Sequence, residues 1–270
     1  KCKIVLAFFR TGQYTCYMLI FCCRTRGTNI ISGWNVSQNF KGGKALSIYG
    51  ISDLHLSFST NKPMNIFKGW ENHTERIAAN WKRLVKPADT VILPGDFSWG
   101  LKLEETKKDF EFLENLPGKK ILLKGNHDLW WSTSKKLREF LDNNKFSSVD
   151  FIFNNCAVCE GYAVAGTRGW FFDDKPDPKI LQREAGRLEA SLTAAEKTGL
   201  PILTFLHYPC VWSDEVCEEI FGVIKRHGIK RVYHGHIHGA GVCKVKTEHD
   251  GVKFRLLSCD CVDFTPVFIV

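Results

Sequence analysis

The hydrophobic pattern predicts five short buried strands, each followed at once by a polar side chain that can bind a metal ion. Each apolar run is short and is bounded by glycine, proline or polar residues, which is typical of strands inside a sheet. The runs cover residues 46–51, 90–94, 120–123, 201–206 and 229–233. The segments that follow them contain Asp53 with His55, Asp96, Asn126-His127-Asp128, His207, and His236 with His238. Because ligands of open α/β sheets gather outside the carboxyl ends of strands, we expect these five ends to meet at one site.

Between these runs, apolar residues recur at helical spacing. The pattern predicts helices over residues 71–85, 103–116, 180–197 and 213–228, and a further helix that begins at Ser132 or Thr133. His73, in the first of these helices, is expected to be exposed. The helix over 180–197 is expected to lie across a sheet, and the alternative is that it caps the site.

After Asn143 the pattern changes to shorter apolar runs separated by turn residues, which indicates a second sheet. The runs that we expect to form its strands are 149–153, 156–160, 162–166, 241–246, 252–258 and 263–270. The last three are expected at its edges.

Five segments, taken together, resemble the signature of the calcineurin-like metallophosphoesterases in both order and spacing. They are Asp53-Leu54-His55, Gly95-Asp96, Gly125-Asn126-His127-Asp128, His207 and Gly235-His236-Ile237-His238. Each one alone is short enough to arise by chance, but five in the same order are not. The resemblance covers about residues 46 to 258. It implies an α/β fold, a four-layer sandwich of two packed mixed β-sheets flanked by helices, and the alternation of strands and helices supports this fold class.

The resemblance also implies two divalent metal ions as cofactors. Carried over position by position, one ion would be bound by Asp53, His55, Asp96 and His238. The other would be bound by Asp96, Asn126, His207 and His236, so that Asp96 bridges the two. Imidazole nitrogens with carboxylate and amide oxygens, and no cysteine in any motif, suit Mn, Fe, Zn or Ni, and the sequence does not choose among them. Two aspartates neutralise only half of the four positive charges, so such a site attracts a phosphate.

The reaction that the resemblance implies is hydrolysis of a phosphomonoester or phosphodiester by a hydroxide that bridges the ions. His127 has no ion to bind in the family pattern and lies where it can stabilise or protonate the leaving oxygen, with Asp128 orienting it. Arg168 lies in a glycine-flanked turn and could contact a substrate phosphate, or else form a surface ion pair. Tyr208 could line the substrate pocket, or else belong to the core.

Other functional classes share these motifs. A cyclic-nucleotide phosphodiesterase or a nuclease of the same fold would carry the same motif residues. A non-catalytic binding scaffold, such as a retromer subunit that resembles this family, would lack ligands, and none is missing here. Trp99, Trp130, Trp131 and Trp170 lie close to the motifs or to Arg168, and they either stack on a nucleobase or sugar or belong to the core.

Charge and composition narrow the choice of partner. The 270 residues carry a net charge of +8, but residues 1–43 hold six of the 37 Lys and Arg and none of the 29 Asp and Glu. The rest of the chain is therefore only +2, which does not indicate a nucleic-acid surface. The expected partner is a small phosphorylated substrate, and the oligomeric state stays open.

The chain divides in composition near residue 43. We expect a metallophosphoesterase domain over 44–270, preceded by a basic, Cys-rich extension over 1–43 that is either an accessory hairpin or translated upstream sequence. No apolar run in that extension approaches the roughly 18 residues needed to cross a bilayer, so no membrane association is expected. Eleven cysteines in no even framework predict reduced thiols in a cytoplasmic protein.

Overall fold

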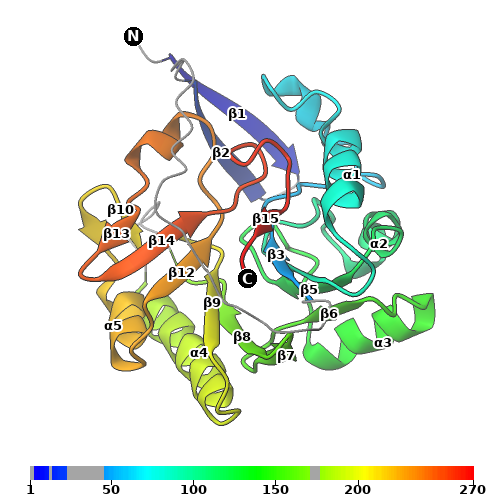
Figure 1. Ribbon diagram of the computed structural model, residues 1–270. Helices are drawn as coiled ribbons and strands as arrows, with labels where there is room; N and C mark the ends of the chain where they lie inside the picture. The colour runs from blue at the N-terminus through cyan, green and yellow to red at the C-terminus, as the bar shows by residue number, and fades with distance from the viewer. Residues whose placement is uncertain (1–2, 12–13, 23–45, 171–176) are drawn as a thin grey trace.

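The structure is a computed structural model that describes residues 46–170 and 177–270 in full, and residues 3–11 and 14–22 through their backbone. Its two large sheets lie face to face, and helices cover the outer side of each (Figure 1). Helices α1, α2 and α3 lie on one side of the molecule, and α4 and α5 lie on the other. The carboxyl ends of the central parallel strands point toward the same rim of the sandwich.

The first sheet has five strands in the order β15-β3-β4-β5-β6. They are β3 (Ile48–Gly50), β4 (Thr90–Pro94), β5 (Lys119–Leu123), β6 (Val149–Phe151) and β15 (Val267–Phe268). The first four are parallel, and β15 joins β3 antiparallel. Because parallel neighbours need a long return connection, the connections contain α1 (His73–Leu84), α2 (Lys107–Glu114) and α3 (Ser134–Asn144). The 3₁₀ helices η1 (Met64–Ile66) and η2 (Leu103–Thr106) precede α1 and α2.

The second sheet has six strands in the order β13-β14-β12-β9-β8-β7. They are β7 (Ala157–Cys159), β8 (Tyr162–Thr167), β9 (Ile202–Leu206), β12 (Arg231–His234), β13 (Glu248–His249) and β14 (Val252–Leu256). The four inner strands are parallel, and the two edge strands are antiparallel to their neighbours. Helix α4 (Pro178–Glu196) connects β8 to β9, and α5 (Glu218–Arg226) lies between β9 and β12. A small hairpin of β10 (Val211–Trp212) and β11 (Glu215–Val216) precedes α5, and the 3₁₀ helix η3 (Ala240–Lys244) follows β12.

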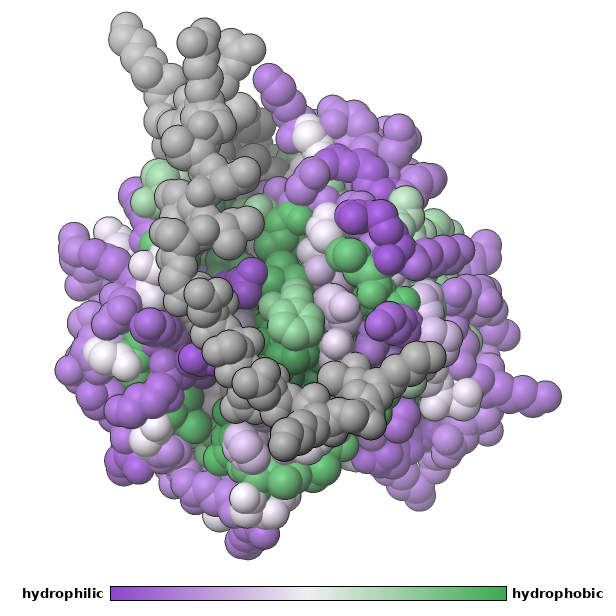
Figure 2. Space-filling model, in the orientation of Figure 1, coloured by the Kyte–Doolittle hydropathy of each residue, from purple (hydrophilic) through white to green (hydrophobic). Residues whose placement is uncertain are grey.

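Three buried hydrophobic clusters hold the layers together. The central one contains side chains from both sheets, among them Ile92 and Phe205, and so joins the sheets face to face. The other two lie between each sheet and its helices, and include Trp81 of α1 and Leu188 of α4. The order of layers is helix, sheet, sheet, helix, which is the four-layer α/β sandwich expected from the sequence. Figure 2 shows hydrophilic residues over the outer parts of the molecule and hydrophobic surface along the line between the two halves.

Several local predictions of strands and helices are wrong. The strand predicted over 252–258 is not an edge strand, because β14 lies between β13 and β12. The strand near Val149 pairs with β5 in the first sheet, because α3 returns the chain beside β5. The C-terminal strand joins β3 rather than the second sheet. Residues 240–244 form η3 instead of a strand. Ser213 has a left-handed backbone (φ 51°) in the turn of the β10–β11 hairpin, so the helix begins only after Cys217.

The segment before residue 46 is described only over β1 (Lys3–Thr11) and β2 (Tyr14–Cys22). These strands pair antiparallel, with Thr11 opposite Tyr14. A hairpin was one of two alternatives for the extension, but its relation to the folded domain, like the boundary at residue 43, stays a prediction. No helix in the described ranges combines the length and the apolar character needed to cross a membrane.

Candidate metal centre

The five strand ends singled out in the sequence meet at one rim of the sandwich. Strands β3, β4 and β5 of the first sheet and β9 and β12 of the second all deliver polar side chains there. Two groups of side chains have ligand atoms within 4.8 Å of one another, namely Asp53, His55 and His238, and Asp96, His207 and His236. Each group contains residues from both sheets. The site therefore exists only when the two sheets are packed together.

Unusual backbone geometry aims these side chains. Asp53, His55, Asp96 and His236 all have left-handed backbones, with φ values of 61°, 47°, 52° and 71°. Such conformations cost on the order of 1–3 kcal/mol each and persist only where the surroundings enforce them. Here the loops after β3 and β4 support each other, because the N–H groups of Asp53 and His55 donate to the carbonyls of Gly95 and Asp96 at 3.0 Å. Four of the twelve non-glycine residues with positive φ in the described ranges are thus residues expected to bind metal.

Two motif glycines allow the loops to approach this closely. A Cβ atom on Gly125 would overlap the backbone nitrogen and the carboxylate of Asp96. A Cβ atom on Gly235 would overlap the side chains of Ser52 and Asp53. Any side chain at either position would push two strand ends apart, so the glycines are needed for space.

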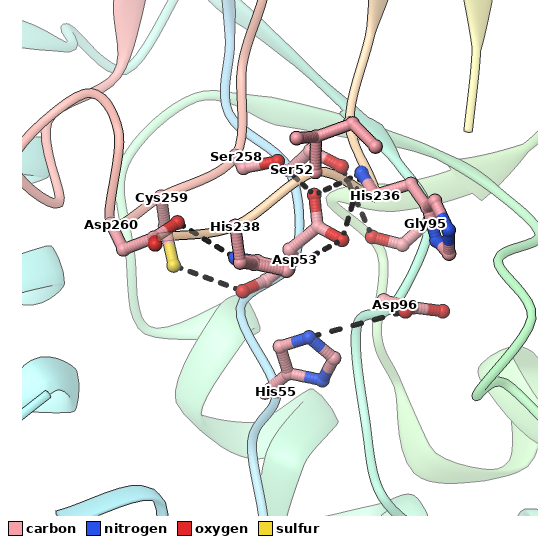
Figure 3. Close-up of polar contacts among 12 residues, drawn as sticks. Ser52, Asp53, His55, Gly95, Asp96, His236, His238, Ser258, Cys259 and Asp260 are labelled. Atoms are coloured by element: carbon pink, nitrogen blue, oxygen red, sulfur yellow. Dashed lines mark hydrogen bonds and ion pairs between the residues drawn. The ribbon is translucent and has the colours of Figure 1, made fainter. Parts of the chain in front are cut away.

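The Asp53 carboxylate lies at the centre of the first group (Figure 3). It accepts the His236 backbone N–H at 3.0 and 3.1 Å and the Ser258 hydroxyl at 3.0 Å. Its Oδ1 lies 3.3 Å from His238 Nε2. Burial raises the pKa of Asp53, but His238 and the other nearby imidazoles outweigh it and hold the pKa well below its usual range. Asp53 is therefore held as an anion.

His238 is oriented by Asp260, a residue that the sequence analysis missed. Nδ1 of His238 lies 2.7 Å from Asp260 Oδ1, so Nδ1 carries the hydrogen and Nε2 is left to face Asp53. The other Asp260 oxygen accepts the Gly239 N–H at 3.0 Å. A carboxylate behind the second ring nitrogen is the usual arrangement of a metal-binding histidine. Asp260 also follows a parallel strand, β14, and the strand-end pattern extended by one strand would have found it.

The second group contains Asp96, His207 and His236, and Asn126 joins it. His207 Nδ1 lies 3.0 Å from the Pro94 carbonyl, so it donates there and leaves Nε2 toward the site. Nε2 lies 2.6 Å from Asn126 Oδ1, and His236 Nδ1 lies 3.0 Å from the same oxygen. Burial lowers the pKa of His207, which keeps it a neutral imidazole. The amide oxygen of Asn126 therefore lies between the two histidines.

Asp96 connects the two groups. Its Oδ2 lies 3.9 Å from His55 Nε2 and 3.5 Å from His207 Nε2, and these histidines belong to different groups. Its Oδ1 accepts the His127 N–H at 2.8 Å. Burial raises the pKa of Asp96, and the carboxylates of Asp53 and Asp128 raise it further. Carboxylates crowded together in this way favour the binding of a cation.

The donor set fits divalent metal ions. Both ring nitrogens of His55 are buried, and neither has a hydrogen-bond partner among the residues that the structure describes in full. Buried polar atoms normally have a hydrogen-bond partner. A bound metal ion would give the two His55 nitrogens the partner that they lack among these residues. Imidazole nitrogens with carboxylate and amide oxygens suit borderline transition metals.

Residues 46–240 match the family described as calcineurin-like phosphoesterase. The chain belongs to this family. The match spans all five motif segments, and it fits both the two-sheet fold and the two ligand groups. Family membership and these groups support a metal-dependent phosphoesterase.

Individual relatives are distant. An uncharacterized protein of Methanocaldococcus jannaschii is 34% identical over 86 residues, which are 30% of this chain and 46% of that protein. The chain thus spans about half the length of this curated relative. A protein of unknown function from Aquifex aeolicus has 19% identity and a TM-score of 0.45, covering 83% of this chain and 95% of its own. The phosphopantetheinyl hydrolase of Mycobacterium tuberculosis has 15% identity and a TM-score of 0.47, covering 80% and 90%.

His127 of this calcineurin-like phosphoesterase lies beside the ligand groups. Its Nε2 is 3.9 Å from Asp96 Oδ2, and its ring packs 4.4 Å from the Trp99 ring. The side chain is buried, and burial followed by the charge of His236 lowers the pKa of His127 to about 3. The structure therefore places His127 at the centre but outside both ligand groups.

Asp128 has a different environment from the one expected. Its carboxylate accepts the backbone N–H groups of Asp96, Phe97 and Gly125 at 2.7–3.0 Å, and also the Trp130 indole N–H. It makes no hydrogen bond to the imidazole of His127. Burial raises the pKa of Asp128 to about 6, yet all of its partners are donors, which favours the ionised form at neutral pH. Asp128 holds the loops after β4 and β5 together instead of orienting His127.

The two candidate substrate contacts are neighbours, because the Tyr208 N–H donates to the Arg168 carbonyl at 2.9 Å. Tyr208 is buried, and its ring lies 4.3 Å from that of His236. Arg168 is not a surface ion-pair partner, because it pairs at 2.9 Å with the fully buried Glu184. Its guanidinium also lies 4.8 Å from the Trp170 ring.

Trp99, Trp130 and His73, which lie near the motif segments, are all buried. Trp99 and Trp130 are both 3% exposed; Trp99 stacks on His55 at 4.9 Å, and Trp130 lies in the core under α3. His73 was expected at the surface, but it is buried against Trp70 and Phe264 because the left-handed backbone of Asn72 starts α1 against the core.

Proposed function

We propose that the protein is a dinuclear-metal phosphoesterase that hydrolyses a phosphomonoester or phosphodiester. The observation that carries the proposal is the position of Asp96 between two ligand groups. One ion would be held by Asp53, His55, Asp96 and His238. The other would be held by Asp96, Asn126, His207 and His236. This is the same division that family resemblance implies.

The ions would activate water near neutral pH and neutralise charge on the phosphoryl oxygens. The chain itself supplies the geometry around them. His207 and His238 present Nε2 because their Nδ1 atoms are bound to Pro94 and Asp260. His127, close to both groups, would stabilise or protonate the leaving oxygen.

The choice of Mn, Fe, Zn or Ni as native metals rests on the donor set and is part of this proposal. The small net charge of residues 44–270 favours a small phosphorylated substrate over a nucleic acid. A non-catalytic scaffold is disfavoured, because every residue of the two expected ligand sets is present in the sequence. The seven described cysteines are all free, which fits the expected cytoplasmic location.

The test is a metal-dependent activity panel. The purified protein is treated with a chelator, and Mn, Fe, Zn, Ni or Mg is added back singly. Each form is then assayed on phosphomonoesters, phosphodiesters, cyclic nucleotides and pyrophosphates. We expect chelation to abolish hydrolysis and one or more transition metals to restore it. Activity that survives complete chelation, or no hydrolysis of any substrate with any metal, would contradict the proposal.

The same panel distinguishes a phosphodiesterase from a phosphomonoesterase by the substrate class that is hydrolysed faster. Preference for cyclic nucleotides would identify a cyclic-nucleotide phosphodiesterase, and preference for oligonucleotides a nuclease. Both outcomes retain the metal chemistry and change only the substrate.

A further inference from the structure

A cavity of about 390 Å³ with both polar and apolar walls lies outside the two ligand groups. It lies between the end of β5, the start of α3, the end of β8 and helix α4. Its polar lining includes Lys124, Ser132, Thr133, Arg168, Glu184 and Arg187. Its volume is in the range of small-ligand pockets.

Backbone connections place this cavity beside the ligand groups. Lys124 is two residues before Asn126, so their Cα atoms are at most about 7.6 Å apart. On the other wall, the carbonyl of Arg168 accepts the backbone N–H of Tyr208, the residue after His207. Two of the cavity's walls are therefore continuous in the backbone with segments that carry expected metal ligands.

The cavity is positively charged, and a buried carboxylate holds its two arginines in place. Glu184 is fully buried, and its Oε1 accepts Arg168 Nη2 at 2.9 Å and Arg187 Nη1 at 2.6 Å. Its other oxygen accepts the Thr167 hydroxyl at 3.2 Å. With Lys124, three basic groups face one carboxylate, which leaves a net charge of +2. Each guanidinium retains donors that Glu184 does not use.

Two donors in the lining have no partner within the described part of the chain. Arg168 Nε is buried and makes no hydrogen bond. Lys124 makes neither a hydrogen bond nor an ion pair. Three basic side chains with one carboxylate in the lining favour an anionic ligand.

The amino-terminal end of α3 adds to the positive electrostatic potential in the cavity. Thr133 caps this helix by accepting the Lys136 N–H, and the helix begins at Ser134 beside the cavity. The amino-terminal end of a helix carries a partial positive charge and favours anions. The helix end and the three basic side chains therefore act on the same volume.

We propose that this cavity binds a second phosphate group of the substrate while the scissile phosphate lies at the metal centre. The preferred substrate is then a small phosphate ester with two phosphate groups separated by a short linker. This inference rests on the proposed phosphoesterase function and specifies its substrate class. The competing interpretation is that Arg168, Glu184 and Arg187 only tie α4 to β8.

The test compares α,ω-alkanediol bisphosphates with the monophosphates of the same alkanediols, over linkers of two to six carbons. With the metal-loaded protein, we expect kcat/KM for the best bisphosphate to exceed that of its monophosphate by about tenfold or more, as charge-assisted hydrogen bonds allow. Lys124→Ala and Arg187→Ala should each reduce this ratio severalfold. Matched controls on the same elements are Lys135→Ala on α3 and Arg183→Ala on α4, which remove one exposed cation outside the cavity and should keep the ratio.

Binding of the same compounds, measured by calorimetry, separates this inference from the proposed reaction. If nothing is hydrolysed but the bisphosphate binds more tightly than the monophosphate, and Lys124→Ala removes the difference, the phosphate site stands and the reaction is wrong. If the wild-type protein shows no preference, or if Lys124→Ala and Arg187→Ala both leave it unchanged, the cavity does not bind the second phosphate. An equal loss in the two control variants would overturn the inference too, because the preference would then follow overall charge.

Discussion

Asp260 acts on the metal centre through His238, since it holds the Nδ1 hydrogen and leaves Nε2 for an ion. Removing such a carboxylate typically lowers metal affinity about 10–100-fold. We therefore expect Asp260→Ala to weaken one metal position by that factor and to leave the other nearly unchanged. Stepwise titration with metal, monitored by calorimetry, measures the affinity of each position.

The matched control is Asp263→Ala, because Asp263 lies three residues away, is exposed, and pairs with Arg76 on α1. It should bind both metals normally. Normal binding by Asp260→Ala, or an equal loss in the control, would show that Asp260 does not position His238.

His127 lies next to the ligands without belonging to either group, so its loss should affect turnover more than assembly. Loss of a positioned acid typically costs about 10²–10⁴-fold in rate. His127→Ala should keep its metals and its approximate KM while kcat falls. The deficit should be smaller for nitrophenyl phosphate, whose leaving group needs little protonation. Equal deficits would indicate stabilisation of the phosphoryl oxygens, and loss of metal would make His127 a ligand.

At this scale the sequence predicts the ligands well and their supporting partners poorly. Each ligand follows an apolar run that ends at a turn, so its position can be predicted locally. The bond between Asp260 and His238 and the ion pair between Glu184 and Arg168 each join residues from separate elements, and no local pattern encodes them. Asp128 was predicted to orient His127 because the two are adjacent in sequence. Its hydrogen bonds to the loop after β4 join separate elements too, so the sequence did not reveal them.

Helix α3 was predicted together with its capping residue, and the other helices were predicted from amphipathic spacing. Thr133 caps α3, and Asp177 caps α4 by accepting the Lys179 N–H at 2.9 Å. Helix α4 packs on β8, as expected, and its residues Glu184 and Arg187 also line the cavity next to the metal centre. The start of α5 was misplaced because the apolar residues of the β10–β11 hairpin happen to continue its helical spacing.

Helices α4 and α5 are joined by an ionic contact that should depend on pH. His227, at the end of α5, lies 2.7 Å from Glu196 and 2.8 Å from Glu189, both on α4. Burial lowers the pKa of His227, but the two carboxylates outweigh it and raise the pKa above its usual value. The resulting stability is fully present below the unfolded pKa of about 6.5 and is lost as pH rises through the folded pKa.

We therefore expect His227→Gln to reduce the free energy of unfolding by about 0.5–1 kcal/mol at pH 6 and by less at pH 9. Urea denaturation at both pH values measures this. The wild-type protein and His227→Gln share the same metal centre, so its titration cancels when their free energies of unfolding are subtracted. A cost that is the same at both pH values would show that the contact is not ionic.

For the whole molecule, the family resemblance supplied the four layers and the alternation of strands and helices supported them, but neither gave the membership of each sheet. The short strands β6 and β15 fit either sheet by composition, and tertiary pairing with β5 and β3 decides between them. The convergence of five strand ends followed from topology alone, because parallel strands in both sheets point toward one rim.

The amino-terminal extension offers a test of the domain boundary. Residues 1–43 contain no acidic residue, and the family match begins only at residue 46. A chain that begins at Lys44 should remain folded, bind the same number of metal ions and hydrolyse the same substrates. Thermal unfolding and the activity panel are the measurements. Aggregation or loss of activity would place the extension inside the catalytic fold.

The central claim is that Asp96 joins two metal ions in one centre, and metal stoichiometry tests it most directly. Elemental analysis of the metal-loaded protein should give two ions per chain, with Asp142→Asn as an exposed-carboxylate control. In Asp96→Asn we expect metal content to fall at both positions and hydrolysis to be abolished, because a shared ligand serves both ions. Two ions per chain and near-normal turnover in Asp96→Asn would contradict the account.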